Sequence, residues 1–289
     1  MNGVINVYKP TGMTSYDVVH KMKKICNTKK VGHTGTLDPE ASGVLPICIG
    51  RATKLVDYIM DDYKVYKAEL LLGTVTDTYD REGRIIETSE VTATEEEVIT
   101  AIKKFQGEIS QIPPMYSALK VNGQRLYDLA RKGIEIERQP RKVTIYNIDI
   151  LEVCLPKVIF NVKCSKGTYI RSLCYDIGKS LGCGGAMWNL ERIATGEFHL
   201  NNSVKLEELN NDNVEKFLIP MDTALKKFES IHIDAYFETM LINGVSLKNE
   251  KVISSIEKEK LYRVYTSNDR FLGLGSRDDN GFKIVKLLI

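Results

Sequence analysis

The segment GHTGTLDPEASG, residues 32–43, places Asp38 among glycines, small hydroxyl residues and a proline. A proline biases the preceding backbone away from the helical region, and glycines let a chain turn sharply beside a ligand. A carboxylate held on such a loop could act as a nucleophile or a base. The alternative is a helix N-cap followed by proline, although Gly43 and Pro46 would limit that helix to about one turn.

A carboxylate that stays ionised in a partly closed pocket needs a nearby cation to offset its lost hydration. Arg171, in the segment SKGTYIRSLCYDIG, is the best candidate, because we expect it in the first turn of a helix capped by Thr168. A positive charge is unfavourable near the positive end of a helix unless an anion faces it. An ordinary surface arginine is the alternative interpretation.

The positioning elements are those of a mixed α and β chain. A strand, a turn and a helix are predicted within residues 3–25, and Thr94 with Glu97 forms a capping box for a helix over residues 94–107. Paired prolines and an Asn-Gly turn indicate a long basic excursion over residues 111–142. Because the strands do not alternate strictly with helices, we expect an α+β fold with a mixed, mostly antiparallel sheet.

The chain has 289 residues, of which 43% are apolar and 27% charged, so it can bury a substantial core. We expect a catalytic domain over residues 1–225 and a small β-rich, barrel-like domain over residues 226–289. The net charge is only +2, but residues 1–30 hold six lysines and one acid, and residues 120–142 hold seven basic residues and three acids. Such segments suit an elongated anionic ligand, or they are simply solvated faces.

Other chemistries find little support in the sequence. The six cysteines form no C-x-x-C pair and the four histidines are scattered, so no metal site is expected. We expect reduced, mostly buried thiols and a cytoplasmic protein, since no signal peptide is recognised and no apolar run reaches membrane-spanning length.

Five segments together resemble a known family. They are KPTGMTSYDVV, KVGHTGTLDPEASGVLPICIGRATKL, YKVYKAELLLGTVTDTYDREG, IPPMYSALKVNGQRLYDLARKG and CSKGTYIRSLCYDIGKSLGCGG, in this order. In order and content the set resembles the bacterial TruB-type tRNA pseudouridine synthases, over about residues 3–200. The resemblance implies a pseudouridine-synthase-like catalytic domain that isomerises uridine 55 in the tRNA T loop. The C-terminal segment resembles, more weakly, the small PUA-like domain that ends these enzymes.

The resemblance assigns the chemistry of the loop. Asp38 matches the family's nucleophile, Arg171 its cationic partner, and Tyr66 the aromatic residue that stacks on the target base and assists proton loss from C5. Attack at C1′, attack at C6 and a glycal route all stay open. No cofactor and no metal is implied, because the isomerisation oxidises nothing and transfers no phosphate.

The same resemblance implies a pocket for the extruded base. Tyr169 and Leu190 would line it, and His33 would help hold the target nucleotide out of the loop. Taken singly, Tyr66, Tyr169 and Leu190 would be read as packing residues, because aromatic and leucine side chains are mostly buried. Their place within one ordered set of motifs favours the functional interpretation.

The implied partner is the T stem-loop of tRNA, bound by a protein that we expect to be a monomer. The phosphate-binding candidates are Lys9, Lys120, Arg125, Arg131 and Lys132. One departure is that Glu191 precedes Arg192, where the family often has two basic residues, which leaves RNA contacts there open.

Two other classes of function remain as alternatives. A non-catalytic RNA-binding protein or RNA chaperone would account for the basic segments, although not for the set formed by Asp38, Tyr66 and Arg171. A glycoside hydrolase would pair Asp38 with Asp77 or Asp80 as the second acid, but the sequence shows no convincing proton-donor pocket.

Overall fold

The computed structural model describes residues 1–60, 63–117, 119–121, 123–249 and 253–289. Within these residues a ten-stranded sheet has the order β14-β1-β3-β12-β4-β11-β10-β7, with β2 beside β3 and β13 beside β12. Its strands are β1 (Gly3–Lys9), β2 (Val31–His33), β3 (Ser42–Ile49), β4 (Lys64–Leu72), β7 (Gly107–Gln111), β10 (Arg141–Cys154), β11 (Lys157–Cys164), β12 (Gly185–Thr195), β13 (Phe198–His199) and β14 (Val204–Lys205). The pairs β1–β14 and β3–β12 are parallel and the other pairs named here are antiparallel, which confirms the predicted α+β fold and sheet type.

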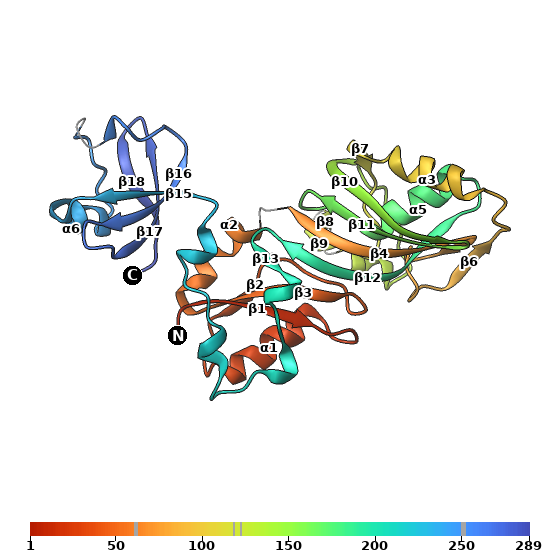
Figure 1. The fold of residues 1–289 in the computed structure, drawn as a ribbon, viewed down its shortest axis with the longest axis horizontal. Helices are drawn as coiled ribbons and strands as arrows, with labels where there is room; N and C mark the ends of the chain where they lie inside the picture. Colours follow the sequence, from red (N-terminus) through yellow and green to blue (C-terminus); the bar gives the residue numbers. More distant parts are fainter. Residues whose placement is uncertain (61–62, 118, 122, 250–252) are drawn as a thin grey trace.

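Strands β4 and β12 form the middle of this sheet and join its two halves (Figure 1). One half carries β1, β2 and β3, and the other carries β7, β10 and β11. The described helices are α1 (Ser15–Ile25), α2 (Val56–Met60), α3 (Glu95–Lys103), α4 (Leu126–Ala130), α5 (Ile170–Ser180) and α6 (Glu238–Ile242). In Figure 1, α1 lies with the first half, while α3 and α5 lie with the second.

Local signals explain where these helices begin. Reciprocal capping boxes start α1 at Thr14 and α3 at Thr94, and the capping box at Thr94 was predicted. The predicted cap at Thr168 is wrong, because the Thr168 hydroxyl donates to the Ser165 carbonyl and Tyr169 is the N-cap of α5. The backbone of Tyr169 is held instead by Gln111, whose side chain accepts from its N–H and donates to its carbonyl.

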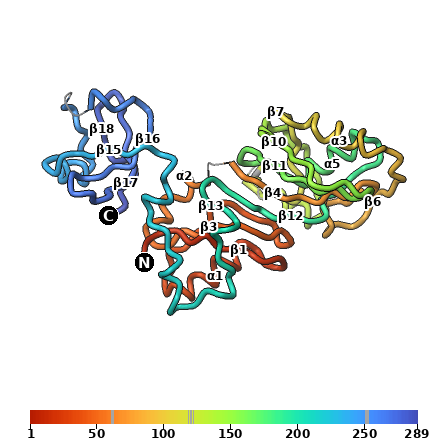
Figure 2. The backbone as a smooth tube through the Cα atoms, viewed as in Figure 1, coloured from red at the N-terminus to blue at the C-terminus, as the bar shows by residue number. Residues whose placement is uncertain are grey.

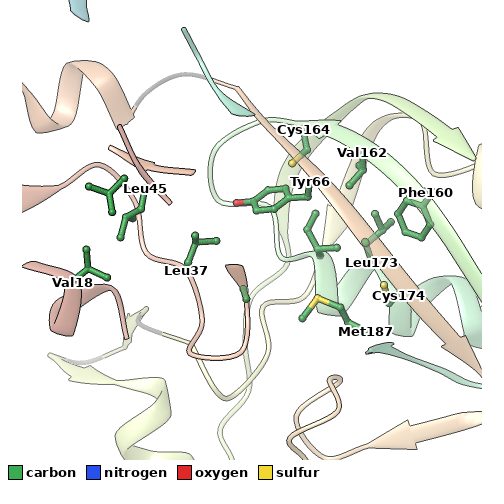
Figure 3. Packing of buried hydrophobic residues seen from close by; sticks show 14 of the residues in the cluster. Val18, Leu37, Leu45, Tyr66, Phe160, Val162, Cys164, Leu173, Cys174 and Met187 are labelled. Atoms are coloured by element: carbon green, nitrogen blue, oxygen red, sulfur yellow. The ribbon is translucent and has the colours of Figure 1, made fainter. Parts of the chain in front are cut away.

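One hydrophobic cluster extends across both halves of the sheet (Figure 3). Val18 and Leu45 belong to it in the first half, and Phe160 and Leu173 belong to it in the second. Burial alternates along β11, where the inward-facing residues Val158, Phe160, Val162 and Cys164 are all fully buried. A shared core fixes the two halves relative to each other, and with them the loops at their junction.

Two smaller units project from the main sheet. Strands β5 (Thr74–Thr76) and β6 (Ile85–Thr88) form one hairpin, and residues 77–84 connect them. Strands β8 (Lys120–Val121) and β9 (Gln124–Arg125) with α4 form the excursion, which is built on its own cluster of Met115, Leu126 and Leu129. The excursion therefore has a local core of its own.

The C-terminal residues form a separate four-stranded sheet in the order β15-β16-β17-β18. Its strands are β15 (Glu229–Ile233), β16 (Leu261–Thr266), β17 (Phe271–Asp278) and β18 (Gly281–Leu287). The short 3₁₀ helices are η1 (Gly50–Leu55), η2 (Leu200–Asn202), η3 (Leu206–Glu208), η4 (Val214–Phe217), η5 (Thr223–Leu225) and η6 (Ala235–Phe237). The chain reaches this sheet along the N-terminal strand (Figure 2), where Val4 and Ile219 exchange backbone hydrogen bonds of 2.9 and 2.8 Å.

Five of the six cysteines are buried and all six are free thiols, so the expectation of mostly buried thiols is confirmed. In the part of the chain that the structure describes, no helix combines the length and the apolar character that a membrane span requires.

Candidate active site

Asp38 lies on the loop between β2 and β3, at the junction of the two halves of the sheet. The N–H of Ala41 donates to the Asp38 carbonyl over 3.1 Å, which closes a tight turn at Pro39 and Glu40. No helix follows this turn, so the helix-cap interpretation of Asp38 is wrong. The carboxylate, whose side chain is 37% exposed, is left open to solvent and to a ligand.

Arg171 brings its guanidinium to this carboxylate from the first turn of α5. Its Nη2 lies 2.9 Å from Asp38 Oδ2, and its Nη1 donates to Asp80 Oδ2 over 3.3 Å. Only 8% of the side chain of Arg171, and 8% of that of Asp80, is exposed. One buried guanidinium therefore bridges two aspartates, and Asp38 is the more accessible of the two.

Asp80 is a site residue whose position the sequence did not predict. It lies in the connection between β5 and β6, where its Oδ1 accepts from the Thr78 hydroxyl over 2.6 Å and from the Glu82 N–H over 3.1 Å. From the sequence, Asp80 was considered only as a candidate second acid of a hydrolase, together with Asp77. Its own hydrogen bonds fix the carboxylate that receives Arg171.

Tyr66 is an inward-facing residue of β4 and only 9% of it is exposed. In Figure 3 its hydroxyl points toward the side of Leu37, on the loop that carries Asp38, while Phe160 lies on the other side. Burial raises the pKa of Tyr66, and the guanidinium of Arg192 opposes part of that shift. The phenol is therefore protonated at neutral pH and offers an uncharged ring beside the loop.

Arg192 ties the loop of Asp38 to the middle of the sheet. It is 1% exposed, and it pairs in register with Gly43 of β3 on one side and Tyr66 of β4 on the other. Its Nε donates to the Val44 carbonyl over 2.7 Å and its Nη2 to the Gly35 carbonyl over 3.1 Å. The sequence did not decide whether this arginine contacts RNA. In the structure it is buried and holds both ends of the loop from inside the protein.

Gly43 permits this arrangement. Its φ is +109°, and a Cβ at that position would lie 2.3 Å from the Arg192 carbonyl oxygen. Only glycine fits so close a backbone approach at positive φ. The glycine that shaped the sequence prediction is thus required by the contact between the loop and β12.

A small recess opens beside these groups. Asp38, Asp80 and Leu190 line it, so the structure brings the predicted pocket residue Leu190 together with both aspartates. Its remaining lining residues are Glu40, Ala41, Arg81, Glu82, Met187, Trp188 and Asn189. Four of the lining side chains are acidic, and burial with the charges of Asp80, Glu40 and Asp38 raises the pKa of Glu82.

A third arginine, Arg81, stabilises the rim of the recess. Arg81 Nη2 donates to Glu40 over 2.5 Å, and Arg81 Nη1 donates to the Asn189 side chain over 2.6 Å. Asn189 in turn donates to Glu69 on β4 over 2.5 Å. The loop of Asp38, the β5–β6 connection and the central strands are joined by this chain of polar contacts.

The two other predicted pocket residues lie close to the same loop or helix. Tyr169 directly precedes α5 and is half-buried, and burial raises its pKa. His33 ends β2, where its Nδ1 accepts from the Gly35 N–H over 3.2 Å. Burial and then Arg192 lower the pKa of His33, so its ring is neutral at neutral pH.

The prediction that Lys9 binds phosphate is contradicted by its burial. Its side chain is 0% exposed, and its Nζ donates to the carbonyls of Pro10, Met13 and Pro39 at 2.8, 2.7 and 3.0 Å. Burial lowers the pKa of Lys9 to about 8. Three carbonyls match the three donors of an ammonium group, so Lys9 links the β1–α1 turn to the loop of Asp38.

The predicted phosphate contacts on the excursion are exposed where the structure describes them. The guanidinium groups of Arg125 and Arg131 both lie over the ring of Tyr127, at 5.7 and 5.5 Å from its centroid. Lys132 is also exposed, whereas the side chain of Lys120 lies outside the described part of the chain. The exposed groups combine positive charge with an aromatic ring, a combination that suits nucleic acid.

Two sequence models of known families match this chain. The model described as "TruB family pseudouridylate synthase (N terminal domain)" matches residues 23–170. The model described as "tRNA pseudouridylate synthase B C-terminal domain" matches residues 171–226. The first match alone spans more than half of the chain and contains Asp38, Tyr66 and Asp80.

Curated relatives are similar to this chain over its whole length. A protein named "tRNA pseudouridine synthase B" from Clostridium tetani is 58% identical over 290 residues, and one of the same name from Clostridium acetobutylicum is 56% identical over 288 residues. In both comparisons the alignment covers 100% of each chain.

Solved structures show the same fold. A chain of the "Crystal Structure of a Cbf5-Nop10-Gar1 Complex" is 30% identical with a TM-score of 0.74, covering 98% of this chain and 79% of that one. A chain of the "Structure of H/ACA RNP bound to a substrate RNA containing 2'-deoxyuridine" is 27% identical with a TM-score of 0.75, covering 99% and 85%.

Proposed function

Because the chain belongs to the TruB family of pseudouridylate synthases, we propose that it isomerises uridine 55 in the T loop of tRNA to pseudouridine. The reaction breaks the C1′–N1 bond, turns the uracil and forms a C1′–C5 bond. One proton leaves C5 and one is gained at N1, so no atom or electron is gained or lost overall. Relatives of the same length carry the name tRNA pseudouridine synthase B, which supports tRNA as the substrate.

The observation that carries this proposal is the contact between Asp38 and Arg171 at the recess. Asp38 serves as the nucleophile, and Arg171 offsets the lost hydration of its carboxylate when a base covers the site. Asp80 holds the other arm of the guanidinium, so Arg171 is fixed before substrate arrives. Such preorganisation favours catalysis because little rearrangement is then needed.

The target uracil binds to the protein after it is extruded from its stacked position in the tRNA loop. The neutral ring of Tyr66 stacks on uracil, Leu190 and Tyr169 contact it, and His33 helps keep the nucleotide extruded. Extrusion of a loop base costs less than extrusion from a duplex, and stacking in the pocket offsets that cost. The chain's own residues supply this chemistry without a cofactor.

The excursion and the two domains have separate roles in this proposal. The excursion binds phosphates of the T stem through Arg125, Arg131 and Lys132, and the catalytic domain spans residues 1–225. Residues 226–289 form a PUA-like domain that carries the four-stranded sheet. We expect the protein to act as a monomer in the cytoplasm.

A glycoside hydrolase is not supported by the geometry around Asp80, because that carboxylate is committed to Arg171, Thr78 and the Glu82 N–H. Asp77, the other candidate acid, accepts from the Arg84 N–H over 2.9 Å as a turn residue. A purely RNA-binding role does not account for a guanidinium buried between two aspartates.

The substrate assignment is tested with unmodified tRNA and the purified protein. Pseudouridine mapping after incubation should show one new pseudouridine, at position 55, and none in a transcript whose uridine 55 is replaced by cytidine. Pseudouridine only at another position would refute the T-loop assignment while leaving the isomerase activity. No pseudouridine in any tRNA would refute the proposed function.

The role of the excursion gives a separate prediction. Neutralising Arg125 and Arg131 with Arg→Gln substitutions should weaken tRNA binding and reduce the slope of log K against log salt by about one per lost phosphate contact. Binding is measured by filter retention over a range of salt concentrations. The matched control neutralises Lys103 and Lys104, which are exposed on α3 and its C-cap. An unchanged slope in the double Arg→Gln variant would exclude the excursion from the RNA interface.

A further inference from the structure

We infer that a stacked pair of tyrosines, Tyr79 and Tyr175, positions Asp80 and through it Arg171. The two ring centroids lie 4.1 Å apart with an interplanar angle of 20°. Tyr79 is the residue directly before Asp80, and Tyr175 lies on α5 one turn after Arg171. The inference rests on the proposed function, because it concerns how the partner of Asp38 is held.

The backbone at Tyr79 requires a compensating contact. Its φ is +64°, in the left-handed region that a residue with a large side chain rarely occupies. Residues in this region persist when the surrounding structure over-determines them, and they gather at functional sites. Ring stacking is a favourable contact that this conformation makes, because it turns the Tyr79 ring onto α5 while Asp80 turns toward Arg171.

Helix α5 presents the two receiving side chains together. Positions four apart lie on the same face of a helix, so Arg171 and Tyr175 form one row. Two consecutive residues of the β5–β6 connection therefore contact this row. Asp80 forms an ion pair with Arg171, and Tyr79 stacks on Tyr175. Neither contact can shift far without the other.

The rest of the connection is held by β12 and by its own turn. The Tyr79 carbonyl accepts from the Met187 N–H over 2.9 Å, and the Arg81 N–H donates to the Met187 carbonyl over 3.1 Å. These hydrogen bonds fix the main chain of the connection to β12, whereas the stack of Tyr79 on Tyr175 fixes the connection to α5. Removing a ring should therefore loosen the direction of Asp80 without unfolding the hairpin.

The surroundings connect this pair to the RNA-binding excursion. Arg138 and Glu135, at the end of the excursion, are charged neighbours of Tyr79, as is Asp176 on α5. Arg138 is itself held by Glu135 at 3.0 Å and by the Pro113 carbonyl at 3.3 Å. The stack therefore lies within electrostatic reach of the excursion as well as next to Asp80 in the chain.

The test compares Tyr175→Ala with Tyr175→Phe, which keeps the ring and removes only the hydroxyl. Single-turnover pseudouridine formation on saturating tRNA should slow by about threefold to tenfold in Tyr175→Ala, the loss expected if the stack biases Asp80 toward Arg171. The rate of Tyr175→Phe should stay within about twofold of the unmodified protein, since the stack persists. Dissociation constants for tRNA and melting temperatures are measured in parallel.

A double substitution separates positioning from a general structural role. In an Asp80→Asn background, Tyr175→Ala should change the single-turnover rate by less than about twofold, because the residue through which it acts is already altered. Excess enzyme and long incubation keep residual rates measurable. A Tyr175→Ala rate within twofold of the unmodified protein, or the same fold loss in both backgrounds, would overturn the inference.

Different results would refute the proposed function and the role of the tyrosine stack. A fully active Asp38→Asn variant would refute the catalytic assignment, whatever the tyrosines do. An inactive Asp38→Asn variant beside a fully active Tyr175→Ala variant would remove the stack from the mechanism and leave the proposed function intact.

Discussion

Replacing Asp38 by asparagine should abolish pseudouridine formation while tRNA binding stays within about twofold, because the amide keeps the shape of the carboxylate but is not a nucleophile. We expect the rate to fall by at least about a thousandfold, the order of loss seen when an enzyme loses its nucleophile. Arg171 would keep its contact with Asp80, so the site should remain assembled. Loss of rate without loss of affinity is the signature of a group that acts in the transition state.

The measurement is tritium release from RNA carrying 5-tritiated uridine, since the C5 hydrogen must leave when the new carbon–carbon bond forms. Asp57→Asn is the matched control, because it makes the same change at an exposed carboxylate on α2. Release at the normal rate by the Asp38→Asn protein would show that this carboxylate is not the nucleophile.

The pairing of Asp38 and Arg171 could be expected from the sequence because a chemical requirement linked them. An accessible carboxylate on a glycine-rich loop needs a cation, and an arginine at a helix start needs an anion. The structure places their nearest atoms 2.9 Å apart, although Asp38 lies on the loop between β2 and β3 and Arg171 lies on α5. The type of sheet could be predicted for a different reason, because the predicted strands do not alternate strictly with helices as they would in a doubly wound parallel sheet.

The burial of Lys9 and Arg192 was not predicted from the sequence, for one shared physical reason. Lys9 and Arg192 are 0% and 1% exposed, and both donate to backbone carbonyls of the loop that carries Asp38. Sequence patterns weigh a lysine or arginine as a surface charge, since such residues are almost never fully buried unless paired. Carbonyl oxygens are present at every residue, so nothing in the residue types identifies those that will meet a buried cation.

Asp80 was missed because its role depends on a bridge between three separate segments. Its neighbours Thr78 and Glu82 explain a polar turn locally, and that explanation is correct. The additional contact to Arg171 exists only once α5 packs against β12 and the β5–β6 connection reaches α5. The left-handed backbone conformation of Tyr79 was not predicted either, because no residue type in this segment indicates a positive φ.

Replacing Arg171 by lysine should slow pseudouridine formation by about tenfold to a hundredfold, even though the positive charge remains. A lysine ammonium is a single point charge on a flexible stem, so it cannot present two rigid arms to Asp38 and Asp80 at once. Asp80 is largely buried, and a carboxylate left without its cation there is costly, so the variant should also melt at a lower temperature.

Arg81→Lys is the matched control for this substitution, because Arg81 also joins two segments beside the recess but is about one third exposed. Exposed ion pairs contribute about 0–1 kcal/mol, so its effect on rate and melting should be small. Single-turnover rates and thermal melts of the two variants decide between the roles. If Arg171→Lys matched Arg81→Lys in both measurements, the guanidinium between the aspartates would serve only as a charge, and the bridging geometry would have no part in catalysis.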